Sequence, residues 1–311
     1  MRLSHISLGA LALAIATPAM ADSLPAGTPA PDAAATPVAA STAATTPADS
    51  GTPAAVATVD DPSPAPAPAA AAADGATAPP PAFTINGSAT LISDYRFRGI
   101  SQTNLQPAIQ GSITVTHSSG LYATVWSSST SGYVTQSGTG SQEIDLIAGF
   151  KKTYNGVTFD AGVLYYVYPR SRPAGDNSKA DFFEPYADIA YTYGPVTGKV
   201  TVNYAPKQKA LALDQGQTGL LKKNDNVYLA GDLAVAIPKT PLGLTAHVGH
   251  TWGPSWLSLG KEYTDYGFGA TLTYKQLVFG VSYVDTDGTF TLANGKNAAR
   301  SGVVVSLGVS F

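Results

Sequence analysis

Residues 142–169 read QEIDLIAGFKKTYNGVTFDAGVLYYVYP, and this stretch decides the fold. Apolar and polar side chains alternate with a period of two on both sides of Asn155-Gly156. In the first half, Ile144, Leu146, Ala148 and Phe150 share one face, opposite Glu143, Asp145, Ile147 and Lys151. Such alternation predicts half-buried strands, and Asn-Gly favours a two-residue turn because both positions tolerate a positive φ. The stretch therefore predicts a β-hairpin with strands at 142–154 and 157–169.

The same alternation continues from about Phe83 to Phe311. It marks segments at 84–96, 107–118, 121–129, 142–154, 157–169, 181–193, 199–206, 225–237, 242–252, 263–274, 277–287 and 300–311. Short turns fall at 118–120, 155–156, 194–198, 238–241 and 275–276, and long polar loops at 97–106, 130–141, 170–180, 207–224, 253–262 and 288–299. Short turns alternating with long loops are typical of outer-membrane proteins. The sequence predicts an all-β fold, a transmembrane antiparallel β-barrel of about 12 strands. A secreted β-sandwich is the alternative, but it does not require this alternation of connection lengths.

Aromatic residues gather at the ends of the predicted strands. Phe150, Tyr154, Tyr193, Tyr274 and Phe311 lie near the short turns, and Tyr165, Phe183, Tyr204, Trp252 and Tyr266 lie near the long loops. Amphipathic rings are enriched where a barrel crosses the two membrane surfaces, so this distribution agrees with a membrane-spanning fold. The segment 121–129 fits least well, because Tyr122 and Trp126 fall on its polar face.

The N-terminus predicts export. Residues 1–21 combine a short polar start, an apolar run and an Ala19-Met20-Ala21 ending, which is the pattern of a cleaved signal peptide. Residues 22–82 are rich in Ala and Pro and contain no aromatic residue. Such a composition does not bury enough apolar surface to fold, so we expect a disordered periplasmic tether. Residues 83–311 form the predicted barrel domain.

Composition narrows the chemistry. The chain is 13 % charged, against about 25 % in an ordinary soluble domain, and contains no Cys. Disulfides, thiolate metal sites and Cys nucleophiles are thereby excluded. The sequence also contains no phosphate-binding Gly loop or zinc-type His spacing. We predict no cofactor, no metal and, because the charge is nearly balanced, no nucleic-acid partner.

Residues 93–102, SDYRFRGISQ, and residues 107–111, PAIQG, carry a family resemblance. They closely resemble the opening motif of the TorF-type porins, a proteobacterial family of outer-membrane proteins, over about Phe83 to Phe311. The resemblance implies an outer-membrane barrel but no substrate and no catalytic residue. The terminal Phe311 also resembles the signal that the barrel-assembly machinery reads, so this machinery and outer-membrane lipid are the expected partners.

Charged residues in the strands are expected to face the lumen, because a lipid-facing Lys or Arg costs about 2–4 kcal/mol at the midplane. The candidates for a pore lining are Asp145, Asp160, Glu184, Asp188 and Asp232, opposed by Lys151 and Lys199. Asp94, Arg96 and Arg98 share one face at the end of the first predicted strand. They form either a mutually compensated ion cluster or part of a constriction. The barrel topology alone would also place these charges in the lumen, without any role in transport.

The leading functional hypothesis is a porin for small hydrophilic solutes, in which the lumen carboxylates would give a preference for cations. Twelve strands would leave a narrow channel, which the loop 207–224 could plug. Two alternatives remain: a lipid-active enzyme using His250 with Ser255 or Ser258, and a structural barrel joined to the envelope by the tether. The sequence favours a protein that is not an enzyme, because a Ser near a His is weak evidence of catalysis.

Overall fold

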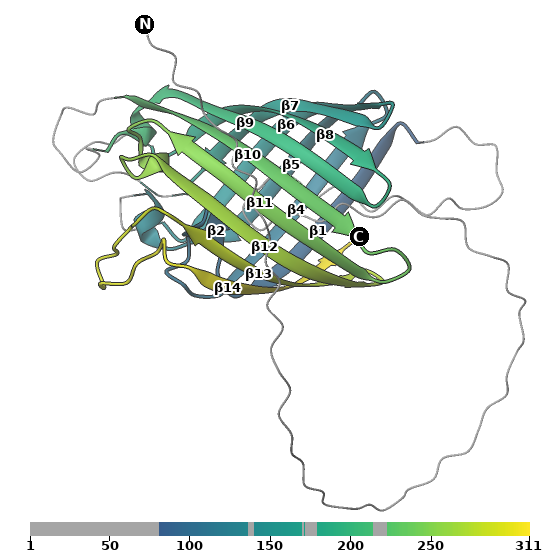
Figure 1. The fold of residues 1–311 in the computed structure, drawn as a ribbon. Helices are drawn as coiled ribbons and strands as arrows, with labels where there is room; N and C mark the ends of the chain where they lie inside the picture. The colour runs from purple at the N-terminus through teal and green to yellow at the C-terminus, as the bar shows by residue number, and fades with distance from the viewer. Residues whose placement is uncertain (1–80, 136–139, 170, 172–178, 214–222) are drawn as a thin grey trace, which may run out of the picture. The chain divides into compact units, whose positions relative to one another are not determined.

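A computed structural model describes residues 81–135, 140–169, 171, 179–213 and 223–311 (Figure 1). The predicted signal peptide and all of the predicted tether except Pro81 and Ala82 lie outside these residues. No helix among the described residues is long and apolar enough to cross a membrane.

Twelve strands of the described chain close into one antiparallel barrel, in which each strand pairs with its sequence neighbours and β1 pairs with β14 (Figure 1). They are β1 (Phe83–Ile92), β4 (Ala108–His117), β5 (Leu121–Ser129), β6 (Gln142–Tyr154), β7 (Val157–Val167), β8 (Phe182–Tyr193), β9 (Val196–Gln208), β10 (Asn224–Ala236), β11 (Leu242–Trp252), β12 (Tyr263–Tyr274), β13 (Leu277–Thr286) and β14 (Gly302–Ser310). The predicted barrel and its strand number are confirmed. Closure leaves no edge strand, so the backbone groups of the wall pair within the sheet.

The connections alternate in length as predicted, which gives the barrel a turn end and a loop end. The hairpin between β6 and β7 turns at Asn155 and Gly156, whose φ angles are 50° and 80°. Two successive positive φ angles give the turn the twist of the strands that it joins. Short 3-10 helices, η1 (Gly132–Thr135), η2 (Lys209–Leu211) and η3 (Trp256–Ser258), lie in three of the long connections.

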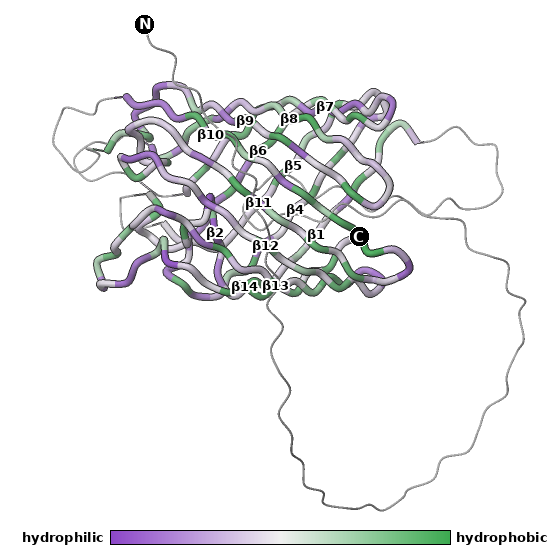
Figure 2. Tube along the Cα trace, viewed as in Figure 1, coloured by the Kyte–Doolittle hydropathy of each residue, from purple (hydrophilic) through white to green (hydrophobic). Residues whose placement is uncertain are grey.

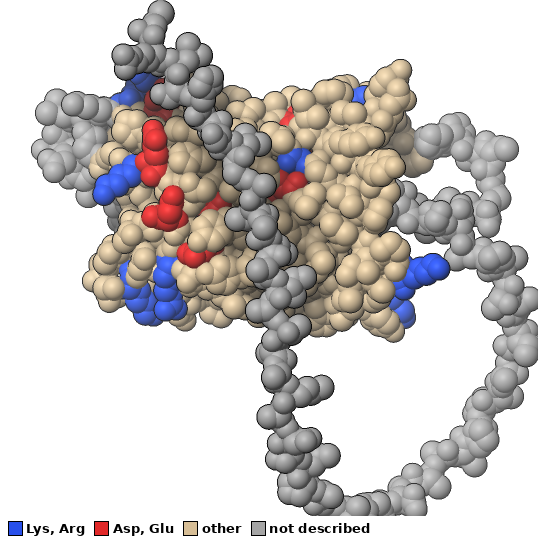
Figure 3. Space-filling view, in the orientation of Figure 1, with Lys and Arg blue, Asp and Glu red and all other residues tan. Residues whose placement is uncertain are grey.

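The exterior is apolar and the interior is polar, the reverse of a soluble protein. On β6, Leu146 and Phe150 are exposed whereas Glu143 and Asp145 are buried. The ten aromatic residues predicted at the strand ends are all exposed, from 37 % for Trp252 to 77 % for Tyr193. Figure 2 shows hydrophilic chain concentrated in the connections at the barrel ends, and in Figure 3 most of the surface that the grey trace leaves uncovered carries no charge. This distribution matches a barrel that faces lipid along its length.

Tyrosines that point inward lie over glycines of neighbouring strands, which explains the poor fit of segment 121–129. A Cβ atom added to Gly149 would lie 2.6 Å from the hydroxyl oxygen of Tyr122, and one added to Gly162 would lie 2.7 Å from that of Tyr186. Trp126 packs against Tyr95, with ring centroids 5.4 Å apart. The glycines of the wall therefore leave the room that these inward-pointing aromatic rings occupy.

The barrel seam ends at Phe311, which the structure places against Gly87 of β1. The two residues exchange backbone hydrogen bonds of 2.8 and 3.0 Å. A Cβ atom at Gly87 would lie 2.6 Å from the Phe311 ring, so the ring covers this glycine. The side chain itself is 70 % exposed, on the same outward face as Val303, Val305, Leu307 and Val309.

The first strand differs from the prediction, because it ends at Ile92 rather than near residue 96. From Ser93 the chain leaves the wall and forms a small hairpin from β2 (Arg96–Phe97) and β3 (Ile100–Ser101). We call residues 93–105 the plug hairpin. The first strand therefore does not include Asp94, Arg96 or Arg98. Asp94 forms hydrogen bonds with side chains of its own loop instead of continuing the sheet.

Candidate functional site

The plug hairpin crosses the lumen near the loop end. Its Tyr95 hydroxyl donates to Glu143 of β6 at 2.8 Å, and the Ser101 amide donates to the carbonyl of Ala298 at 2.9 Å. The turn of the hairpin, Arg98-Gly99, has φ angles of 47° and 75°. Gly99 lies against β12 and β13, because an added Cβ atom would stand 2.6 Å from Thr286 Cγ2 and 3.0 Å from Asp265 Cβ. Contacts with strands on several sides of the barrel fix the hairpin inside it.

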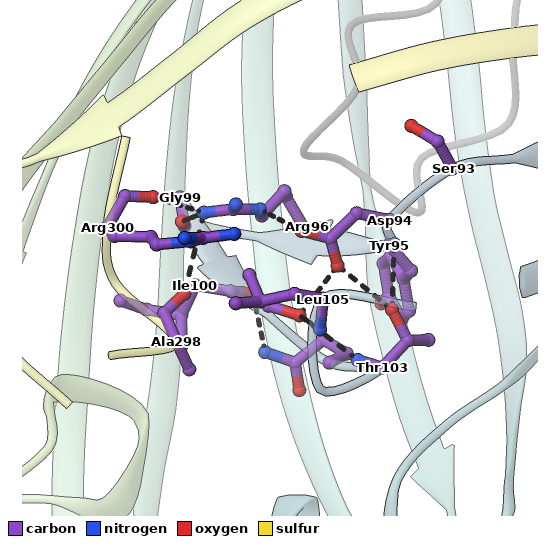
Figure 4. A network of polar contacts seen from close by, with 12 residues as sticks. Ser93, Asp94, Tyr95, Arg96, Gly99, Ile100, Thr103, Leu105, Ala298 and Arg300 are labelled. Carbon is purple, nitrogen blue, oxygen red and sulfur yellow. Dashed lines mark hydrogen bonds and ion pairs between the residues drawn. The ribbon is translucent and has the colours of Figure 1, made fainter. Parts of the chain in front are cut away.

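Asp94 holds the base of the plug hairpin (Figure 4). Its carboxylate accepts hydrogen bonds from Ser101 Oγ at 2.6 Å, from Thr103 Oγ1 at 2.9 Å and from Arg96 Nε at 2.6 Å. Arg96 Nη1 in turn donates to the backbone carbonyls of Gly99 at 3.0 Å and Arg300 at 2.8 Å. Both side chains are almost completely buried. These charge-assisted bonds fold the loop back on itself and tie it to the segment before β14.

Arg98 does not join this cluster but crosses the lumen to the opposite wall. Nη2 donates to both carboxylate oxygens of Glu184 at 2.9 Å, and Nη1 donates to Asn226 Oδ1 at 3.0 Å. Burial acts to lower the pKa of the Arg98 guanidinium, but the facing Glu184 carboxylate outweighs it, so the pKa is raised and the side chain stays charged. Charge-assisted hydrogen bonds of this kind are among the stronger hydrogen-bonded contacts in proteins.

The other predicted carboxylates also face the lumen, and two of them have basic partners. Lys151 Nζ lies 2.8 Å from Asp160 Oδ2, and Lys199 Nζ lies 3.4 Å from Asp232 Oδ2. Each lysine pairs with its carboxylate because the two face each other in the register of adjacent strands. Asp145 and Asp188 are buried on the inner faces of β6 and β8, and Asp188 lies opposite Asp160.

A second group, which the sequence analysis did not single out, surrounds His247 on β11. Its Nδ1 lies 2.7 Å from Asp232 Oδ1 and its Nε2 lies 2.9 Å from Asp265 Oδ1. The Tyr228 hydroxyl donates to Asp265 at 3.0 Å. The alternation within each strand already predicted that these side chains point inward. The partners of His247 come from the two neighbouring strands, β10 and β12, and sequence spacing does not align them. No three His, Asp or Glu side chains among the described residues are arranged to hold a metal ion.

The residues of the enzyme hypothesis face different ways. His250 lies on the outward phase of β11, where it contacts Thr264 Oγ1 at 2.9 Å and packs against Trp252. Ser255 and Ser258 are completely buried in the turn around η3. The arrangement therefore offers no support for a Ser-His pair.

A small aromatic pocket of about 50 Å³ lies at the loop end, above the plug hairpin. Its lining includes Phe97, Tyr133, Tyr168, Phe182, Trp256 and Phe290. The predicted plug loop 207–224 reaches this pocket through Ala210, but residues 214–222 lie outside the described residues. Among the described residues, the first long connection, residues 93–105, crosses the lumen.

Comparison with known proteins gives a family and a set of similar folds. A family model described as a bacterial protein of unknown function (Gcw_chp) matches residues 74–311. No curated protein matches the sequence. Among solved structures, the NanC porin is 12 % identical, with 73 % of this chain and 99 % of that chain covered and a TM-score of 0.49. The KdgM porin is 8 % identical (73 % and 97 % covered, TM-score 0.44), and an outer-membrane channel from Pseudomonas putida F1 is 11 % identical (75 % and 96 % covered, TM-score 0.41).

Proposed function

Because the chain belongs to the Gcw_chp family of bacterial proteins of unknown function, we propose a function from the barrel itself: passage of small hydrophilic solutes across the outer membrane. One observation carries the proposal. A closed wall with an apolar exterior encloses a lumen lined by charged and polar side chains. Such a lumen would be costly to maintain in a barrel that served only as an anchor, because each buried charge requires a partner.

The opening motif at residues 93–102 supports a closer assignment to the TorF-type porins, which we retain as part of the proposal. We further propose that residues 1–21 are a signal peptide that directs export and that residues 22–82 are a tether. Both ends of the barrel would then lie in the periplasm. An even number of strands puts the two chain ends on the same side of the membrane.

The plug hairpin makes passage conditional. Twelve strands leave only a narrow interior, and residues 93–105 occupy it at the loop end. Solutes would pass when the hairpin moves aside, so Arg98 and its partner Glu184 would set the closed state. Insertion of the purified protein into planar bilayers tests the proposal: brief, infrequent openings are expected, and a complete lack of conductance in every plug variant would overturn it. Release of fatty acid from lipid would instead favour the enzyme alternative.

The lumen is expected to favour cations, because in the part of the chain that the structure describes its carboxylates outnumber its basic groups. The carboxylates are those of Glu143, Asp145, Asp160, Glu184, Asp188, Asp232 and Asp265. The basic groups are Lys151, Lys199, His247 and the two arginines of the plug hairpin, Arg96 and Arg98. Changing both Asp188 and Asp232 to Asn should move the reversal potential in a salt gradient toward neutrality. Glu262→Gln, on the exposed loop before β12, is the control. An anion-selective channel would contradict this prediction.

Phe311 is proposed as the assembly signal, a role separate from its contribution to stability. Phe311→Ala removes apolar contacts worth no more than about 2 kcal/mol. The backbone bonds to Gly87 remain, so the folded barrel should persist. The amount of barrel in the outer membrane should nevertheless fall severalfold, as measured by heat-modifiable mobility on gels. Tyr274→Ala, at the same end and also exposed, should leave the amount unchanged. Equal amounts for both variants would remove the recognition role.

A further inference from the structure

The contacts of Arg98 describe a site built around a guanidinium group. Glu184 binds one edge of the group through two oxygens, and Asn226 accepts from the other nitrogen. The Tyr228 ring lies 4.1 Å from the guanidinium carbon and the Phe97 ring lies 4.8 Å from it. A planar cation is therefore held at its edges by acceptors and at its faces by rings, which matches the shape and charge of guanidinium better than those of a simple ion. We call Glu184, Asn226, Tyr228 and Phe97 the cage.

The cage belongs mainly to the barrel wall and is fixed by further bonds. Glu184 on β8 accepts a hydrogen bond from the Tyr166 hydroxyl at 3.1 Å. The Asn226 amide nitrogen on β10 donates to Thr251 Oγ1 at 2.9 Å and to the Trp252 carbonyl at 2.8 Å, which directs its carbonyl oxygen toward Arg98. Of the four cage residues, Phe97 alone is part of the plug hairpin. Three sides of the cage thus remain in place when the hairpin leaves.

We propose that the cage is a binding site for the guanidinium group of a solute, and that Arg98 is its tethered occupant. The inference rests on the proposed solute passage and names a substrate class for it: small organic cations that carry a guanidinium group. When the hairpin moves aside, Glu184 becomes a buried carboxylate without its counter-ion, and such a group strongly favours a returning cation. A guanidinium solute restores both the charge pair and the stacking, whereas potassium restores only the charge.

Chemical rescue tests the site without any need for conductance. Arg98→Ala empties the cage, and its unfolding temperature in detergent is measured against methylguanidinium, with potassium chloride at equal ionic strength and urea as the neutral planar analogue. A bound ligand stabilises the folded state in proportion to RT ln(1 + [L]/Kd). Methylguanidinium should raise the unfolding temperature saturably, and the other two solutes should not. In the double variant Arg98→Ala with Glu184→Gln, the apparent affinity should fall at least about tenfold.

Conductance then separates this inference from the proposed function. Methylguanidinium should reduce the current through Arg98→Ala over the same concentration range that stabilises it. Current without stabilisation or block by methylguanidinium would overturn the cage and leave solute passage standing. Stabilisation in a barrel that never conducts would support the cage and overturn passage. If Arg98→Ala does not fold, the same titration is made on Gly99→Val, whose displaced hairpin should vacate the cage with every charge retained.

Discussion

Arg98→Ala is expected to convert a channel that is mostly closed into one that is mostly open. The variant breaks a buried ion pair between the plug hairpin and β8. Removing one partner of such a pair costs about 3–5 kcal/mol, because the other charge stays buried without compensation. In the open state of the wild type the two groups are already apart, so the loss falls on the closed state. A free-energy change of this size shifts the ratio of closed to open channels by about a hundredfold to a few thousandfold.

Single-channel recording in planar bilayers measures this ratio directly. Arg300→Ala is the matched control, since it also removes one arginine at the loop end. Arg300 accepts a hydrogen bond from Arg96 through its backbone carbonyl, which the substitution retains. The control should therefore gate like the wild type. If Arg98→Ala remains as closed as Arg300→Ala, the Glu184 pair does not hold the plug.

Gly99→Val should open the channel without changing any charge. A Cβ atom at this position would meet Thr286 Cγ2 at 2.6 Å and Asp265 Cβ at 3.0 Å, which belong to the barrel wall. The backbone φ of +75° is in addition unfavourable for a β-branched residue. Clash and strain both act against the docked hairpin, so an increase in open probability comparable to that of Arg98→Ala is expected.

Gly295→Val separates the steric clash from the backbone strain. Gly295 has a φ of +79° but no atom within 4 Å of an added Cβ, so the substitution carries the strain without the clash. It should gate like the wild type. The double variant Arg98→Ala with Gly99→Val should resemble either single variant, because both release the same hairpin and their effects are not additive. Full additivity would point to two separate gates.

Most of the wall was predictable from the sequence, because its signals are local. The two-residue period placed Asp145 and Asp232 on the inner face, and Asn155-Gly156 defined a turn without any knowledge of the rest of the chain. The strand boundaries differ from the predicted ones where tertiary contacts replace the hydrogen bonds of the sheet. The strand predicted as 199–206 extends to Val196–Gln208, and the first strand stops at Ile92.

The interior was decided by the tertiary structure. Arg98 and Glu184 lie 86 positions apart, and nothing in the alternation of apolar and polar residues specifies that they meet. His247 likewise gains Asp232 and Asp265 from strands on both sides, through a register that barrel closure sets. The two-residue period of a strand follows from its own backbone geometry. It is therefore visible in each short segment of sequence without reference to the rest of the chain. The partner of a charge in the lumen depends on the curvature of the whole wall and on which loop enters it, and these are properties of the closed sheet rather than of any segment.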